Sequence, residues 1–256
     1  MHECLLALWR MRRRMDPTIL AELADVSPMT MSRVLRRWIP RFGRAGRSLV
    51  WLPTMGYVDA TVPASFREYG MANTALIGDA TDILTETMRT AITRRNQMRS
   101  DKSSHSAAMG VSWCTPSGWT AIASDLVLGR TSEYQAAVHL APQFAGVPNS
   151  HSLAYDKGVA SLRAHLPNLN NVLVPCFLSG GHYSASQAIR NRAIACNRYV
   201  IEVTYSRVKM WEMLKPTVPV QDFEYLNDVW WWALGFCNLT CAPLKKGASK
   251  SRKVGV

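Results

Sequence analysis

Two aspartates follow short apolar segments that have the composition of buried strands. Asp79 comes shortly after the apolar run Ala75–Ile77, and Asp156 comes directly after Ser152–Tyr155. Side chains at the end of a strand can point toward a surface site, so we expect both carboxylates to face a site rather than the core. Taken singly, an aspartate at such a position is usually a turn former or a cap. A chemical role therefore depends on other groups that converge on the pair.

Glu202 is the third acidic group, and it lies inside a predicted long helix. Arg198 precedes it by four residues and Lys209 follows it by seven, so at about 100° per residue the three side chains fall within roughly 40° of one another. An adjoining apolar stripe should pack this helix on the sheet: Ile194, Ile201, Tyr205 and Val208. Glu202 would then lie at the edge of the buried face, within reach of the strand-end carboxylates. The alternative is a surface glutamate paired with Arg198.

These three acidic motifs resemble those of a known family. Residues 77–81, Ile-Gly-Asp-Ala-Thr, and residues 156–159, Asp-Lys-Gly-Val, look like the first and second aspartate motifs of the Harbinger-type DDE transposases. The triplet of Arg198, Glu202 and Lys209 matches the glutamate motif of that family with its spacing intact, and it is the most specific part of the likeness. The resemblance covers almost the whole chain and extends to bacterial insertion-sequence transposases and to inactive, host-domesticated descendants.

The resemblance implies a metal-dependent nuclease that cuts DNA and transfers the cut strand. Its catalytic residues would be Asp79, Asp156 and Glu202. Together with Glu133, they would bind two Mg²⁺ or Mn²⁺ ions roughly 4 Å apart, because hard cations prefer carboxylate oxygens. Water and then a 3′-hydroxyl would attack phosphorus in line. Arg198 and Lys209 would bind the DNA phosphates.

Two residues depart from the family pattern. Glu133 replaces the usual aspartate and so adds one methylene to the side chain, and Val159 replaces an aromatic residue. Both departures slightly favour a second interpretation, a catalytically inactive, transposase-derived protein that binds DNA sequence-specifically, because a fold can persist without its activity. A third interpretation is an RNase H-like nuclease that acts on RNA or a hybrid and recognises 2′-hydroxyl groups. The basic segment Thr30–Arg37 argues against it.

The N-terminal residues predict a helix-turn-helix. Thr18–Ala24 has the pattern of a short helix, and Ser27 with Pro28 has the pattern of a capped start for a second helix over Met29–Trp38. Four side chains of that second helix can project toward base edges and phosphates: Thr30, Arg33, Arg36 and Arg37. The alternative is a helical hairpin with a solvated basic face. Ten arginines between residues 10 and 47 favour DNA binding.

The remaining pattern predicts the elements that position these groups. Strands are expected at residues 75–77, 107–113, 119–123, 153–155 and 172–174, with the second and third joined as an antiparallel hairpin. Helices are expected at residues 133–140, after residue 157, at 184–215 before Pro216, and at 222–239. This order predicts an α/β fold. With the resemblance, it implies an RNase H-like mixed sheet flanked by helices and preceded by a small all-α helix-turn-helix domain.

Composition divides the chain into four expected parts. Residues 1–45 form the helix-turn-helix domain, 46–70 a linker, 71–244 the nuclease domain, and 245–256 a basic tail that we expect to be disordered. The net charge of +12 suits a polyanionic partner. With the resemblance, that partner is double-stranded DNA at transposon ends. Assembly into a homo-oligomer and help from an accessory DNA-binding protein are both compatible with the sequence.

Other features narrow the class of protein. No run reaches the roughly 18 apolar residues of a membrane span, so we expect no membrane partner. The six cysteines form no CxxC pair, and we interpret them as reduced core thiols of an intracellular protein. Trp230–Trp232 could stack on bases, yet their apolar surroundings favour a core helix. The basic tail predicts a nuclear protein in a eukaryotic host, and otherwise a cytoplasmic or nucleoid one.

Overall fold

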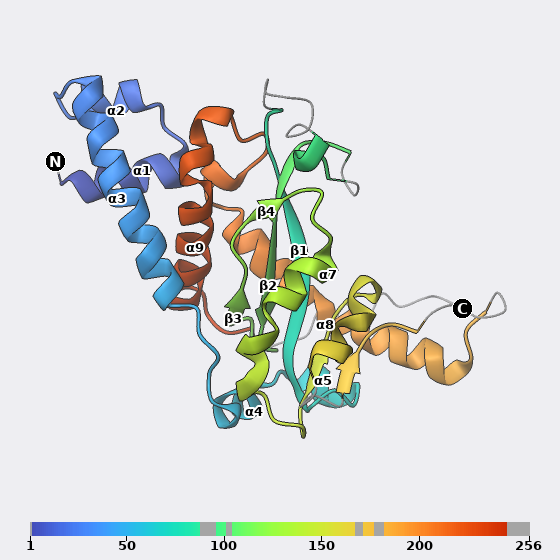
Figure 1. The fold of residues 1–256 in the computed structure, drawn as a ribbon. Helices are drawn as coiled ribbons and strands as arrows, with labels where there is room; N and C mark the ends of the chain where they lie inside the picture. Colours follow the sequence, from blue (N-terminus) through green and yellow to red (C-terminus); the bar gives the residue numbers. More distant parts are fainter. Residues whose placement is uncertain (1, 88–95, 101–103, 167–170, 177–181, 245–256) are drawn as a thin grey trace, which may run out of the picture.

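The centre of the fold is a six-stranded mixed sheet (Figure 1). The computed structural model describes residues 2–87, 96–100, 104–166, 171–176 and 182–244. The strands run in the order β3-β2-β1-β5-β6, and β4 pairs with β2. Neighbours among β1, β2 and β3 are antiparallel, whereas β5 and β6 run parallel to β1. The strands are β1 (Thr74–Leu84), β2 (Ala107–Cys114), β3 (Thr120–Ala123), β4 (Val127–Leu128), β5 (Ser152–Ala154) and β6 (Asn171–Leu173).

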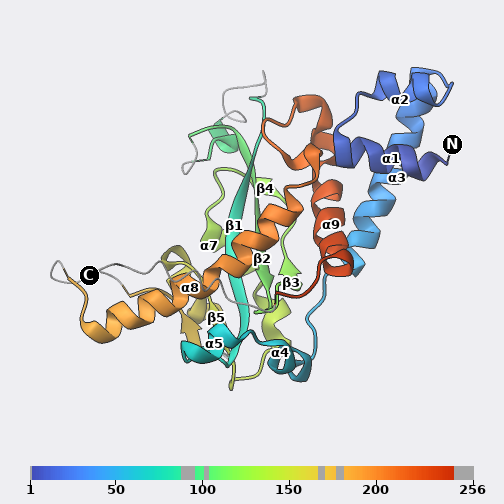
Figure 2. The ribbon, with the colours of Figure 1, turned by 180° about the vertical axis from the view of Figure 1, so that it is seen from behind.

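Helices cover both faces of this sheet (Figures 1 and 2). Helix α8 (Ala185–Val208) crosses β1 and β2 on one face, and α7 (Glu133–His139), followed by the 3-10 turn η1 (Ala141–Gly146), lies on the other. Because side chains alternate along a strand, the two faces have separate cores: Ile77 packs on the α8 side and Leu76 on the α7 side. This mixed α/β architecture is consistent with the expected RNase H-like fold.

Strand β1 is longer than predicted. Its apolar alternation continues beyond Ile77 through the buried side chains of Ala80 and Ile83, and β2 pairs with it without interruption as far as Leu84. Pairing with β2 therefore extends the strand well past the run of consecutive apolar residues. As a result, Asp79 lies inside β1 and not at its end.

Helix α8 begins where the sequence predicts and ends earlier. Ser184 accepts a hydrogen bond from the backbone N–H of Gln187, whose side chain bonds back to the Ser184 backbone and completes a capping box. The helix ends at Val208 instead of continuing to Lys215, because the following 3-10 turn η3 (Glu212–Leu214) directs buried apolar side chains into the core. Tertiary burial outweighs helix propensity at this point.

The C-terminal helix α9 (Phe223–Thr240) confirms a predicted core element. It follows the 3-10 turn η4 (Val220–Asp222). Trp230 and Trp231 are buried and Trp232 is partly buried, so these side chains pack the core instead of offering stacking surfaces. The prediction of core thiols holds for Cys114 and Cys237 alone, since Cys196 is exposed and the other three cysteines are partly buried.

The N-terminal helices are α1 (Glu3–Arg13), α2 (Pro17–Leu23) and α3 (Pro28–Ser48). Helix α3 packs along α9, and α1 and α2 pack on α3. Ser27 caps α3 by accepting a hydrogen bond from the Thr30 N–H at 3.1 Å, as predicted. The helix continues beyond Trp38 because its second half lies along α9. A Cβ added at Gly46 would lie 2.3 Å from the carbonyl oxygen of Trp231, so only glycine allows this approach. The N-terminal helices and α9 therefore share one core.

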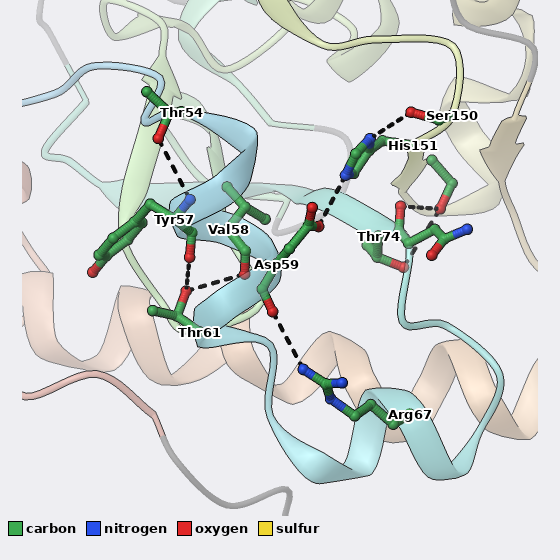
Figure 3. Close-up of polar contacts among 11 residues, drawn as sticks. Thr54, Tyr57, Val58, Asp59, Thr61, Arg67, Thr74, Ser150 and His151 are labelled. Atoms are coloured by element: carbon green, nitrogen blue, oxygen red, sulfur yellow. Dashed lines mark hydrogen bonds and ion pairs between the residues drawn. The ribbon is translucent and has the colours of Figure 1, made fainter.

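The predicted linker contains two short helices, α4 (Met55–Thr61) and α5 (Ala64–Glu68). Figure 3 shows how polar contacts fix them. Arg67 donates to the carbonyl oxygen of Asp59 at 3.3 Å, and the Asp59 carboxylate lies 3.0 Å from His151 Nε2 in the segment before β5. The predicted basic tail, 245–256, lies outside the described residues, and the four-part division of the chain stays a prediction. No helix in the described part of the chain has both the length and the apolar character needed to cross a membrane.

Candidate active site

Two carboxylates emerge side by side from the parallel strands β1 and β5. Ile77 in β1 pairs with Ala154 in β5, and Asp79 and Asp156 each lie two residues further along. Because side chains alternate with a period of two, both aspartates leave the sheet on the face that α8 covers. The Asp79 side chain is 13% exposed and that of Asp156 is 45% exposed. The carboxylate pair therefore lies between the sheet and α8, open to solvent on the Asp156 side.

Arg198 of α8 bridges this pair. Its Nη2 lies 3.2 Å from an Asp79 carboxylate oxygen and its Nη1 lies 3.2 Å from an Asp156 oxygen. Burial alone would lower the pKa of the guanidinium, but the attraction of Asp79 and Asp156 outweighs it and raises the pKa above its usual value. One positive charge thus offsets the repulsion between two carboxylates that face the same space.

The rest of the predicted triplet lies further along α8. Glu202 lies one turn beyond Arg198, on the same face of the helix, and is exposed. Lys209 donates from Nζ to the backbone carbonyl of Asp82 at 3.0 Å, which attaches the end of the helix to β1. The structure therefore brings Asp79, Asp156 and Arg198 into contact and places Glu202 one helical turn from Arg198, exposed at the surface.

Residues 79–238 match the family of DDE superfamily endonucleases. The chain belongs to this endonuclease family. The matched segment covers more than half of the chain, begins at Asp79 and includes Asp156 and Glu202. Family membership supports a transposase-like nuclease with DNA as its substrate. Comparison with curated proteins and with solved structures gives no match.

DDE endonucleases generally use divalent metal ions, so the fit of these residues to such an ion can be tested. Within the described ranges, no three acidic, histidine or cysteine side chains gather closely enough to hold a metal ion. The donor chemistry nevertheless fits, because Asp79 and Asp156 offer carboxylate oxygens, which hard cations prefer, and both already face one shared cation. Here that cation is the guanidinium of Arg198. The carboxylates can therefore hold a divalent ion if Arg198 leaves the space between them.

Glu133 and Tyr155 belong to the α7 side of the sheet. Glu133 is the first residue of α7, and Tyr155 directly precedes Asp156. Burial raises the pKa of Tyr155 well above its ordinary value, and the negative charges of Glu133 and Asp79 add to that effect, so both carboxylates act on the same hydroxyl. That hydroxyl is buried and makes no hydrogen bond to any residue that the structure describes. Because Tyr155 packs in the core on the α7 side, this unsatisfied donor lies on the opposite face of the sheet from the carboxylate pair.

The predicted DNA-contacting residues form a separate surface on α3. The side chains of Thr30, Arg33, Arg36 and Arg37 are exposed. Two of these arginines approach acidic residues: Arg36 lies 3.8 Å from Glu224, and Arg37 lies 3.2 Å from Glu3. Helix α9 stands between α3 and the sheet in both views (Figures 1 and 2). The basic helix and the carboxylate centre therefore lie on opposite sides of α9.

The sequence does not reveal one polar contact made from the apolar stripe of α8. Tyr205 is buried in that stripe, as predicted, and its hydroxyl in addition bonds both Ser112 and the backbone of Asp79. The available signal was a tyrosine one turn after Glu202 in a stripe that is otherwise aliphatic. A buried tyrosine usually has a hydrogen-bond partner for its hydroxyl, so this position could have been examined for one.

Proposed function

We propose that the chain is a Harbinger-type, metal-dependent DNA transposase that cleaves phosphodiester bonds at element ends and transfers the cut strand. The observation that carries the proposal is the convergence of Asp79 and Asp156 on one cation between β1, β5 and α8, within a segment that matches DDE endonucleases. Glu202, one turn from Arg198, is the third acidic residue of the proposed set. Glu133 contributes its charge from α7.

Each residue of the centre has a stated task in this proposal. Asp79, Asp156 and Glu202, supported by Glu133, would hold Mg²⁺ or Mn²⁺, which would supply an activated water and stabilise charge on the departing 3′ oxygen. Arg198 exchanges its carboxylate partners for a DNA phosphate, which a guanidinium binds through paired hydrogen bonds. Lys209 adds positive charge at the same edge of β1. These groups position the scissile phosphate against the carboxylates.

The surface of α3 supplies DNA binding in the same proposal. Thr30, Arg33, Arg36 and Arg37 are exposed along a helix that follows a short helix and a turn, as in a helix-turn-helix reader. DNA contact would replace the ion pairs that Arg36 and Arg37 make with Glu224 and Glu3. Because α9 separates this surface from the carboxylate centre, DNA bound to both would pass around α9.

Cleavage of labelled duplex DNA that carries the terminal repeats of the source element tests the proposal. The wild-type chain should nick the duplex with Mn²⁺ or Mg²⁺, whereas Asp79→Asn and Glu202→Gln should lose at least about 10³-fold in rate, because each removes a charged metal ligand. Glu68→Gln is the matched control, since Glu68 is an exposed acidic residue of α5 outside the centre. Nicking that survives in the Asp79 and Glu202 variants would contradict the proposal.

A second candidate function is a transposase-derived DNA-binding protein without catalysis. The departures at Glu133 and Val159 favour it, and so does the Arg198 guanidinium between the two aspartates. The same assay separates the two candidates. Binding of the duplex by the wild-type chain without nicking under any metal condition would support the DNA-binding protein.

A further inference from the structure

Tyr205 connects α8 to the sheet at the level of Asp79. Its side chain is buried, with the residue 6% exposed, and it lies three residues after Glu202 on the same helix. The hydroxyl donates to the backbone carbonyl of Asp79 and accepts hydrogen bonds from the backbone N–H of Ser112 at 3.2 Å and from its Oγ at 3.1 Å. Asp79 and Ser112 are direct partners in the β1–β2 ladder. The Tyr205 hydroxyl therefore joins α8 to both β1 and β2 at the position of Asp79.

Apart from the Arg198 bridge itself and the contact of the Thr204 hydroxyl with the Cys114 thiol, the contacts that hold α8 on the sheet at this level are less directional. Ile194, Ile201 and Val208 share a core with Ile77, and apolar packing of this kind sets the separation of the layers more firmly than the rotation of the helix. Lys209 reaches the Asp82 carbonyl from the end of the helix with a long, flexible side chain. Hydrogen bonds to a carbonyl and an N–H are directional, so the Tyr205 hydroxyl restricts rotation and sliding of α8.

We propose that Tyr205 is a positioning residue that sets the geometry of Arg198 and Glu202 relative to Asp79. This inference rests on the proposed function. Tyr205 acts through the backbone of Asp79 and through α8, and its side chain does not touch the substrate. Catalytic groups need placement within about 0.5 Å, and errors of about 1 Å cost on the order of 10²-fold in rate.

The test compares Tyr205→Phe with Thr204→Val. Thr204 is the preceding residue on α8 and is buried; its hydroxyl donates to the Val200 carbonyl within the helix at 2.9 Å and also contacts the Cys114 thiol of β2. Thr204→Val therefore removes a buried hydroxyl of α8 that faces the sheet but makes no hydrogen bond to Asp79 or Ser112. Both variants are assayed for DNA nicking and for Mn²⁺ binding by electron paramagnetic resonance. Tyr205→Phe should lower kcat at least tenfold with KM for DNA within twofold, and it should weaken Mn²⁺ binding at least threefold. Thr204→Val should leave all three quantities within twofold.

A third measurement does not depend on activity or metal. The coupling between Asp79 and Arg198 is obtained from urea unfolding of Asp79→Asn, Arg198→Gln and the double variant, first in the wild-type background and then in Tyr205→Phe. If Tyr205 positions the pair, the coupling in the wild-type background should be at least about threefold in the unfolding equilibrium constant. In the Tyr205→Phe background it should fall to a factor of about one, which means no coupling. A purely structural role would lower stability and leave this coupling unchanged.

The outcomes separate this inference from the proposed function. Loss of coupling together with loss of kcat and Mn²⁺ affinity supports both. If the wild-type chain neither nicks DNA nor binds Mn²⁺, the proposed function fails, and the coupling alone decides whether Tyr205 positions Arg198 against Asp79. Coupling that is retained in Tyr205→Phe overturns the inference, whether or not the chain is active.

Discussion

The α3–α9 interface and the carboxylate centre are held together by different physics. At the interface, backbones approach so closely that Gly46 and Gly235 lie against each other, and a Cβ on Gly235 would lie 2.3 Å from the Gly46 carbonyl oxygen. At the centre, Asp79 and Asp156 meet through the charge of Arg198, and Asp156 remains 45% exposed. Close backbone packing holds the α3–α9 interface together, so this interface tolerates little change in side-chain size. Charge fixes the carboxylate centre, so a different cation can replace its central partner.

The largest effect that we expect tests the shape of the interface. Gly46→Val should lower the free energy of unfolding by about 3 kcal/mol, because the new side chain would meet the Trp231 carbonyl at 2.3 Å and the Trp232 Cα at 2.4 Å, and backbone atoms cannot turn aside. Urea unfolding followed by tryptophan fluorescence gives the change. Gly56→Ala in α4 is the control, since a Cβ there meets nothing within 4 Å. A Gly46→Val loss no larger than that of the control would show that the interface can relax.

The sequence predicts elements whose signals are local. The β2–β3 hairpin, the start of α8 at Ser184 and the extent of α9 follow from turn residues, a cap and an apolar pattern close to each element. The extension of α3 could not be predicted, because its second half is stabilised by α9, which lies far away in the sequence. The early end of α8 has the same cause, since burial of Met213 and Leu214 takes the chain out of the helix.

The candidate site divides in the same way. Asp79 and Asp156 face one space because neighbouring strands carry an aspartate at equivalent positions. Helix periodicity places Arg198 and Glu202 on one face of α8. The role of Arg198 as a bridge between carboxylates was not predicted. Sequence spacing shows which side chains share a helix face, but it does not show which residues of the sheet that face contacts. The hydroxyl of Tyr205 was missed for a similar reason, since its partner is a backbone carbonyl that no residue type reveals.

The next effect tests the charge of the centre. Arg198→Gln should tighten Mn²⁺ binding about tenfold, because the divalent ion no longer competes with the guanidinium for two carboxylates that now repel each other. Without metal, the free energy of unfolding should fall by about 1–2 kcal/mol, because the largely buried Asp79 carboxylate loses its cation, whereas solvent screens the Asp156 half of the bridge. Isothermal titration with Mn²⁺ measures the affinity. Lys215→Gln, which removes an exposed charge elsewhere, is the control, and weaker Mn²⁺ binding in Arg198→Gln would reverse the interpretation.

The smallest effect concerns a charged group at the α3–α9 interface, Asp125. Asp125 accepts hydrogen bonds from the indole N–H of Trp231 at 2.6 Å and from Asn227 at 3.0 Å, and it pairs with Arg47 of α3. Burial alone would raise the pKa of Asp125, but the hydrogen bonds from Trp231 and Asn227 and the charge of Arg47 lower it overall. A pKa below the unfolded value of about 3.9 stabilises the fold above that pH, and the stabilisation is lost as the pH falls through the folded pKa.

Asp125→Asn should therefore cost less than about 1 kcal/mol at pH 7, because the carboxylate is 55% exposed and solvent screens its charge. The difference between wild type and variant should shrink as the pH falls from 5 to 3, and urea unfolding at pH 7, 5 and 3 measures it. A difference that stays constant with pH would mean that Asp125 contributes hydrogen-bond geometry and not charge. A difference larger than the effect of Gly46→Val would mean that charge, and not the close approach of the two helices, holds α3 against α9.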